Sequence, residues 1–150
     1  MDGYEHWAHH LLALRDLQSR TGGFTELVPL PFVAQMAPIY RRGQSRRGPT
    51  FREAVLIHAV ARLVLHPYIT NIQSSWVKMG MEGVQACLHA GANDLGGTLI
   101  NESITRAAGA SHGQGVDAQQ LAELASRSGR VLWQRSTLYK ELPKDRVSIS

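Results

Sequence analysis

The sequence predicts an α/β protein, and three observations lead to this class. Stretches with apolar residues at helical spacing alternate along the chain with short runs of strand-forming residues. The connecting helices are about ten to fifteen residues long, which is typical of right-handed crossovers between parallel strands. The composition, with 43% hydrophobic and 19% charged residues in 150, is that of an ordinary globular chain with a packed core. We therefore expect the order α-β-α-β-α-β-α-α-β.

The first half of the chain contains two predicted helices and one predicted strand. Apolar residues at helical spacing predict a helix over residues 5–18, which a glycine pair ends. The run FTELVPL predicts a strand that ends at its prolines, because proline donates no ladder hydrogen bond. After a long loop, Thr50 and Glu53 have the spacing of a capping box. They predict the start of a second helix, which continues to Leu65 and stops before Pro67.

The second half repeats the alternation of strand and helix. YITNIQ and ANDL predict two short strands, and a helical stripe over residues 81–88, closed by Gly91, lies between them. A further helix is expected over residues 100–107. Asp117 and Gln120 form a second capping-box pattern that opens the final helix, and VLWQRSTLY is expected to be an extended strand.

Charge and composition exclude several classes of protein. The net charge of +4 does not by itself indicate a nucleic-acid partner. A single cysteine, Cys87, excludes an intrachain disulfide framework and any iron–sulfur site built from this chain's thiolates alone. MDGYEHWAHH does not resemble a secretory signal, and the apolar stretch AVLIHAVARLVL is shorter than the roughly 20 residues that span a bilayer. We expect a cytoplasmic protein with neither nucleic acid nor membrane as partner.

Polar side chains follow the predicted strands at the points where the strands end. The carboxyl ends of parallel strands meet at one edge of a sheet. Polar side chains gathered there can hydrogen-bond a polar substrate from several sides. The candidates are Glu26, Asn71, Gln73, Ser74, Ser75, Asn93 and Asp94. Taken singly, each is also explained by helix capping or turn formation, which is the commoner role of such residues.

Three other groups of residues are better explained without chemistry. His6 and His10 lie on one helical face but lack a third metal ligand. Together with His9 they are expected at the surface. Loop arginines lack aromatic residues between them and are expected to be solvated: Arg41, Arg42, Arg46 and Arg47. His58 and Cys87 lie on apolar helix faces and are expected to be packing residues.

Five strings in the chain resemble one family closely. They are GGFTELVPLPF, QMAPIY, NIQSSWVKMG, GANDLGGTLINESITRAAGASHGQ and WQRSTLY. In this order they resemble the C-terminal part of the CofH-type radical S-adenosylmethionine enzymes, the 4-hydroxyphenyl transferases of deazaflavin (FO) synthesis, from about Glu5 to Tyr139. The related futalosine-pathway enzymes share G-F-T-E and G-A-N-D, whereas the double glycine of NDLGGTL favours the deazaflavin branch.

The resemblance implies a (β/α)8-like barrel in which S-adenosylmethionine, bound to a 4Fe–4S cluster, yields a 5′-deoxyadenosyl radical. That radical releases the 4-hydroxybenzyl group of tyrosine, which joins 5-amino-6-(D-ribitylamino)uracil, and a CofG-type partner synthase then closes the ring. The family's cluster motif, C-x-x-x-C-x-x-C, is absent here. A whole barrel needs around 250 residues. Residues 1–150 are therefore expected to be the C-terminal part of the barrel domain, about three β/α units and a tail, inactive without the N-terminal half that carries the cluster ligands.

The resemblance also implies site residues where the strings match. Residues expected to orient tyrosine and the diaminouracil are Glu26, Gln73, Ser75, Asn93 and Asp94. Leu30 and Phe32 are expected to border the adenine of the cofactor. Two alternatives remain open: a fragment of a futalosine-pathway radical enzyme of menaquinone synthesis, and a non-catalytic binding module that keeps part of a barrel.

Overall fold

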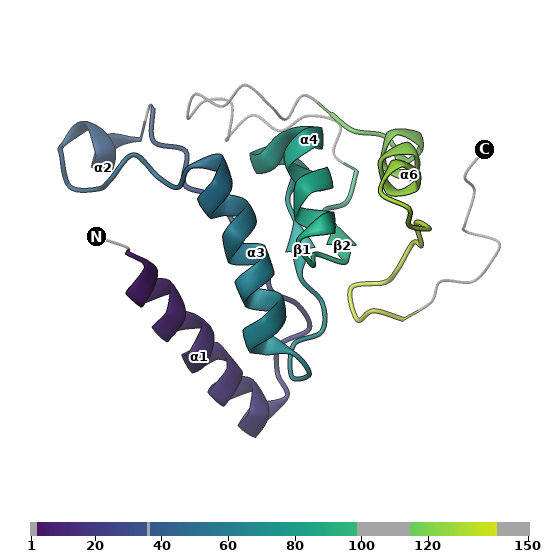
Figure 1. Cartoon of the computed structure of the whole chain (residues 1–150), viewed down its shortest axis with the longest axis horizontal. Coiled ribbons are helices and arrows are strands. Elements are labelled where there is room, and N and C mark those ends of the chain that lie inside the picture. The colour runs from purple at the N-terminus through teal and green to yellow at the C-terminus, as the bar shows by residue number, and fades with distance from the viewer. Residues whose placement is uncertain (1–2, 36, 99–114, 141–150) are drawn as a thin grey trace.

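Helices pack around a short parallel sheet in the computed structural model, which describes residues 3–35, 37–98 and 115–140 (Figure 1). The elements in chain order are α1 (Tyr4–Thr21), α2 (Pro38–Arg41), α3 (Phe51–Leu65), β1 (Gln73–Ser74), α4 (Trp76–His89), β2 (Asp94–Leu95) and α6 (Ala118–Arg127). The helix expected over residues 100–107 lies outside the described residues. The mixed helix and strand content confirms the α/β class.

Local signals place the ends of α1, α3 and α6 where the sequence predicts them. Gly22 ends α1 in the left-handed conformation, with φ of 62°, and its N–H donates to the carbonyl of Gln18 at 2.8 Å. At the start of α3 the Glu53 N–H donates to Thr50 Oγ1 at 3.2 Å, and the Thr50 N–H donates to Glu53 Oε2 at 2.6 Å. Asp117 and Gln120 form the same reciprocal pair at the start of α6. Both predicted capping boxes are confirmed.

Two helices differ from the prediction. The short helix α2 lies within the segment expected to be a loop, and it starts with Pro38, whose fixed φ suits a first helical position. Helix α4 begins at Trp76, earlier than its apolar stripe indicated, because Ser75 occupies the N-cap position. Gly80, with φ of 66°, interrupts the helical geometry inside α4, and only glycine adopts that conformation without strain. The regular stripe predicted the part of α4 beyond this kink.

The sheet consists of parallel segments that are shorter than expected. β1 and β2 pair in parallel, with Gln73 opposite Asp94 and Ser74 opposite Leu95. FTELVPL contributes a single parallel bridge between Leu27 and Ile72, in which the Gln73 N–H donates to the Leu27 carbonyl at 2.9 Å. The prediction of a longer strand there was wrong, since the prolines that follow Val28 cannot extend the ladder. Helix α3 connects the first pair of parallel segments, and α4 connects the second.

The predicted strand VLWQRSTLY is also absent. Residues 131–140 carry no regular strand and end in a turn, in which the Tyr139 N–H donates to the Ser136 carbonyl at 3.0 Å. Tyr139 has a positive φ of 58°. A chain that reverses direction here cannot continue as an extended strand, however strand-prone its composition.

Two hydrophobic clusters hold the helices against the sheet. One lies between α1 and α3 and is made of Leu11, Ala61, Leu65, Ile69 and Ile72. The other joins α4 to α6, and Val84, Cys87 and Leu121 are among its members. His58 and Cys87 are fully buried, 3.5 Å apart between Nδ1 and Sγ, which confirms their expected packing role. Burial lowers the pKa of His58 and raises the pKa of Cys87. Within the described ranges, no helix is both long and apolar enough to cross a membrane.

Candidate functional site

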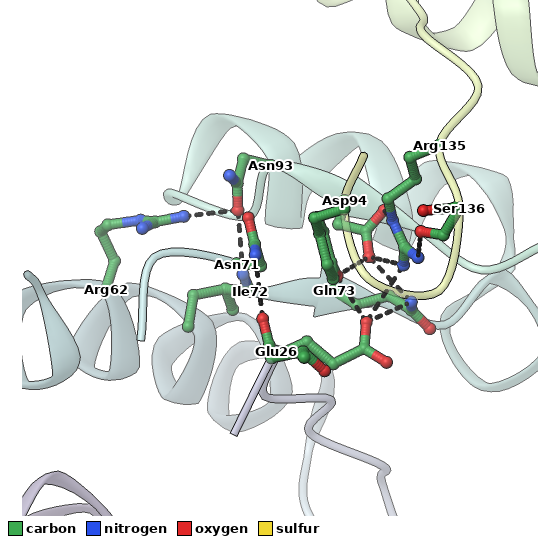
Figure 2. A network of polar contacts seen from close by, with 11 residues as sticks. Glu26, Arg62, Asn71, Ile72, Gln73, Asn93, Asp94, Arg135 and Ser136 are labelled. Carbon is green, nitrogen blue, oxygen red and sulfur yellow. Dashed lines mark hydrogen bonds and ion pairs between the residues drawn. The ribbon is translucent and has the colours of Figure 1, made fainter. Parts of the chain in front are cut away.

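Three candidate residues converge where the parallel segments end. Gln73 lies directly opposite Asp94 in the register, and Glu26 precedes the residue that bridges to the neighbouring segment. The Gln73 amide nitrogen donates to Glu26 Oε2 at 3.0 Å and to Asp94 Oδ2 at 2.9 Å (Figure 2). Ser74, the next residue, is fully buried, as the alternation of side chains along a strand requires. The structure thus brings Glu26, Gln73 and Asp94 together on one face of the sheet.

Two residues of the C-terminal segment complete this cluster. The Arg135 guanidinium donates from Nε to Asp94 Oδ1 at 3.0 Å and from Nη2 to Glu26 Oε2 at 3.1 Å, and Nη2 also contacts Asp94 Oδ2 (Figure 2). The Tyr139 hydroxyl lies 2.5 Å from Glu26 Oε2 and 2.6 Å from Asp94 Oδ2. The guanidinium carbon is 3.9 Å from the centre of the Tyr139 ring. We call Glu26, Gln73, Asp94, Arg135 and Tyr139 the carboxylate cluster.

The electrostatics of the carboxylate cluster favour ionised Asp94. Burial raises the pKa of Asp94, but hydrogen bonds from Arg135, Gln73 and Tyr139 outweigh that effect and hold it below its ordinary value. The hydrogen bond with Asp94 raises the pKa of Arg135. Burial and the two carboxylates raise the pKa of Tyr139, so its hydroxyl stays protonated and able to donate. Two carboxylates facing one guanidinium leave a net negative charge, which suits ligand groups that donate hydrogen bonds.

The structure does not bring Asn93 or Ser75 into the carboxylate cluster. Asn93 points the other way, where its Oδ1 accepts from Arg62 Nη2 at 2.6 Å and from the Ile72 N–H at 2.9 Å (Figure 2). This contact fastens α3 to the start of the sheet. Ser75 is the N-cap residue of α4, without a hydrogen bond from its side chain to the helix. Asn71 donates to the carbonyl of Thr25 at 2.9 Å and thereby also supports the sheet.

Leu30 and Phe32 lie at a separate cavity of about 630 Å³. Both side chains are exposed, at 61% and 42%. The cavity is lined by residues 27–32, by the loop that follows them and by the first turns of α1 and α3. The two helices contribute Trp7 and Ala54. The lining is largely apolar, and Trp7 and Phe32 contribute aromatic rings to it.

Arg46 corrects the expectation that the arginine run is wholly solvated. Its guanidinium carbon lies 5.4 Å from the Trp7 ring centre, and its Nη1 is 3.5 Å from Glu53 Oε1. A cation over an indole and beside a carboxylate is held in place rather than freely hydrated. The other arginines of the run are exposed, namely Arg41, Arg42 and Arg47.

The described residues do not fit a metal cluster. Among the residues that the structure describes, no group of three or more His, Cys, Asp or Glu side chains is placed to hold a metal ion. The predicted surface histidines are exposed on α1, and the Nδ1 atom of His6 accepts from the Gly3 N–H. The only thiol of the sequence, at Cys87, is buried in the core. An iron–sulfur cluster requires thiolates that this chain does not supply.

Arg135 and Tyr139 are the site residues that the sequence analysis did not predict. They lie far along the chain from the strand ends, in a segment expected to be a strand of its own. The only signal for them was the string WQRSTLY, which contains both residues and carries part of the family resemblance.

The fold and the site together define an α/β protein with a polar cluster at the ends of parallel strands. The family model described as "CofH/MqnC C-terminal region" matches residues 21–145, and the chain belongs to this family. Every residue of the carboxylate cluster lies inside the matched region.

Curated relatives are similar along almost the whole chain. The chain is 52% identical over 139 residues to a protein named FO synthase from Mycobacterium leprae, covering 93% of this chain and 16% of that protein. It is 49% identical over 146 residues to an FO synthase from Streptomyces coelicolor, covering 97% and 17%. A Methanopyrus kandleri protein named 5-amino-6-(D-ribitylamino)uracil–L-tyrosine 4-hydroxyphenyl transferase is 51% identical over 140 residues, covering 93% and 38%. The chain therefore spans much less than half the length of these relatives.

Proposed function

We propose that residues 1–150 form the substrate-binding C-terminal part of a radical S-adenosylmethionine barrel domain. The complete enzyme joins the 4-hydroxybenzyl group of tyrosine to 5-amino-6-(D-ribitylamino)uracil. The observation that carries the proposal is the carboxylate cluster, which lies at the ends of parallel segments and inside the family region. The names of the relatives support the reaction, and they favour deazaflavin synthesis over the futalosine pathway.

The chemistry of the cluster matches these substrates. The tyrosine ammonium group is cationic, and the diaminouracil carries amino and ribityl hydroxyl groups, so both present several hydrogen-bond donors. Glu26 and Asp94 offer carboxylate acceptors, with Asp94 held in its ionised form. The Gln73 amide, shared between them, fixes the separation of the two carboxylates. The role of these residues is to orient substrate, since misplacement by about 1 Å is enough to slow a reaction strongly.

Leu30 and Phe32 are proposed to border the adenine of S-adenosylmethionine, in the cavity between α1, α3 and the intervening loop. When bound to the 4Fe–4S cluster of the complete enzyme, this cofactor would supply the 5′-deoxyadenosyl radical. The cysteine ligands of the 4Fe–4S cluster are proposed to lie on an upstream N-terminal part of the barrel, because this chain has a single, buried cysteine. This chain alone is accordingly proposed to be inactive. Asn93 and Ser75 remain proposed substrate residues that contribute from outside the carboxylate cluster.

The reaction also defines partners and location. The coupled product still needs ring closure, which we assign to a CofG-type partner synthase. We place the enzyme in the cytoplasm, where a reducing environment preserves both an iron–sulfur cluster and a free thiol such as that of Cys87.

The experiment that tests the proposal measures formation of the coupled product under anaerobic conditions, with tyrosine and the diaminouracil supplied to the complete protein. Asp94→Ala and Gln73→Ala are each expected to lower turnover more than about tenfold, because each removes a contact that orients substrate. Asp16→Ala and Gln119→Ala, on exposed helix surfaces, are the matched controls and should retain wild-type turnover.

Three outcomes would contradict the proposal. Full activity in both cluster variants would remove the assigned site. No coupled product from the wild-type protein would favour the futalosine-pathway alternative, and substrate binding without turnover would favour a binding module.

A further inference from the structure

We infer that the C-terminal segment, residues 129–140, is a wall of the substrate site, in which Arg135 and Tyr139 are positioning residues that hold Glu26 and Asp94 as oriented anions. The inference rests on the proposed function, because it assigns a role to residues around the same site. Neither residue was among the candidates at the strand ends.

The hydrogen-bond donors of the cluster come mainly from this segment. Glu26 Oε2 and Asp94 Oδ2 are each contacted by the same three groups: the Gln73 amide, the Arg135 Nη2 nitrogen and the Tyr139 hydroxyl. Each of these nitrogens carries two hydrogens and the hydroxyl carries one. Without the segment, the Gln73 amide would be the sole donor of this set between two carboxylates. Two such anions side by side repel each other.

The backbone of the segment is shaped to deliver both side chains. A turn closes through the Ser136 N–H, which donates to the Lys140 carbonyl at 3.0 Å, and through the Tyr139 N–H. Tyr139 adopts φ of 58°, a left-handed conformation that is unfavourable for a residue with a Cβ atom. The strain is retained where the Tyr139 ring stacks on Arg135 and its hydroxyl reaches both carboxylates. The conformation therefore serves the contact with the strands.

Loss of Arg135 has a predictable electrostatic effect. Arg135 is a main reason why the pKa of Asp94 lies below its ordinary value despite burial. Removing the guanidinium raises the pKa of Asp94 and leaves a carboxylate that protonates at higher pH. A residue that only stabilised the fold would lower the amount of folded enzyme without changing the pKa of Asp94, whereas a positioning residue also shifts the acid limb of the kcat/KM profile.

The test measures kcat and KM from pH 5 to 9 in the complete protein. The pKa of Asp94 lies below this pH range in the wild type, so Arg135→Gln is expected to lower kcat/KM more than about tenfold and to bring an acid limb up into the range. Arg135→Lys, which keeps the charge without the planar fork, should restore the position of the limb but only part of the rate. Tyr139→Phe should lower kcat/KM several-fold.

Matched controls separate the cluster from its surroundings. Arg130→Gln removes an arginine of the same segment that donates to the Leu88 carbonyl, and Tyr68→Phe removes a hydroxyl elsewhere. Both should keep the wild-type pH profile. An acid limb that stays in place in Arg135→Gln, or one that moves as far in Arg130→Gln, would overturn the inference.

A second measurement does not depend on turnover. Trypsin must take the Arg135 side chain into its specificity pocket to cleave after that residue, so the contacts with Glu26 and Asp94 protect the bond. In the Glu26→Gln, Asp94→Asn double variant, cleavage after Arg135 should become more than about fivefold faster, while cleavage after Arg130 serves as internal reference and stays unchanged. Equal rates of cleavage after Arg135 in the wild type and the double variant would overturn the inference. Inactivity of the wild-type protein would instead count against the proposed function alone.

Discussion

The side chain of Asp94 shows how neighbours decide the charge of a largely buried carboxyl group. Its side chain is 10% exposed, and desolvation alone would favour the neutral acid. The fork of Arg135 and the Gln73 amide reverse this preference by donating to both carboxylate oxygens. The charge of Asp94 therefore depends on Arg135, a residue that we assign to positioning, as well as on Gln73.

His58 leads to a stability prediction at the same scale. Burial lowers its pKa below the ordinary value of 6.5, so the folded state favours the neutral imidazole while the unfolded state takes up the proton. The stabilising effect is present above about pH 6.5 and is lost as pH falls. We expect the free energy of unfolding of the complete protein to decrease between pH 7 and pH 5, and the decrease to be smaller in His58→Asn. Denaturant titrations at each pH measure it.

The control for this prediction is His9→Asn, which changes an exposed histidine of α1. It should keep the wild-type dependence of stability on pH. An identical dependence in His58→Asn and the wild type would show that the buried imidazole contributes nothing.

At the scale of elements, helix ends are the features that local sequence determines best. Thr50→Ala removes the side chain that accepts the Glu53 N–H at the start of α3, and should lower the free energy of unfolding by about 1 kcal/mol. Thr50→Ser keeps the hydroxyl and should lose much less. Chemical denaturation of the complete protein measures both variants, and equal losses would exclude capping as the cause.

The strands show where local sequence stops being informative. Capping boxes and the Gly22 terminus depend on residues three or four positions apart, and these predictions were confirmed. A strand depends on a partner whose register the sequence does not display, so FTELVPL became one bridge and VLWQRSTLY became a turn. Gly80 interrupts α4, so the apolar stripe predicted only the part of the helix that follows it.

The candidate site, like the fold, was predicted in part from the sequence. Three of the five residues proposed to orient substrate, Glu26, Gln73 and Asp94, meet as the rule for strand ends requires. Asn93 points away from the carboxylate cluster because side chains alternate along a strand. The sequence of a short strand does not show which of its side chains lie on which face of the sheet. Arg135 and Tyr139 reach the site through tertiary structure alone.

At the scale of the whole molecule, the chain exposes apolar surface that a larger assembly would cover. Large side chains are strongly exposed, among them Leu63, Val131, Trp133 and Leu138. Where such side chains form a contiguous patch, the patch normally faces a partner. We expect the isolated 150-residue chain to aggregate, or to melt gradually and bind a hydrophobic dye. Differential scanning calorimetry and light scattering test this, and a sharp cooperative transition of a monomer would contradict it.

The order of synthesis gives the carboxylate cluster a further consequence. Glu26, Gln73 and Asp94 emerge from the ribosome before Arg135 and Tyr139 do, by 41 residues in the case of Asp94 and Arg135. Until Arg135 and Tyr139 are made, the Gln73 amide is the one donor of the carboxylate cluster that these two acids can have. Closure of this end of the sheet therefore waits for the C-terminal segment, and termination of synthesis shortly before it would leave the two carboxylates without Arg135 and Tyr139.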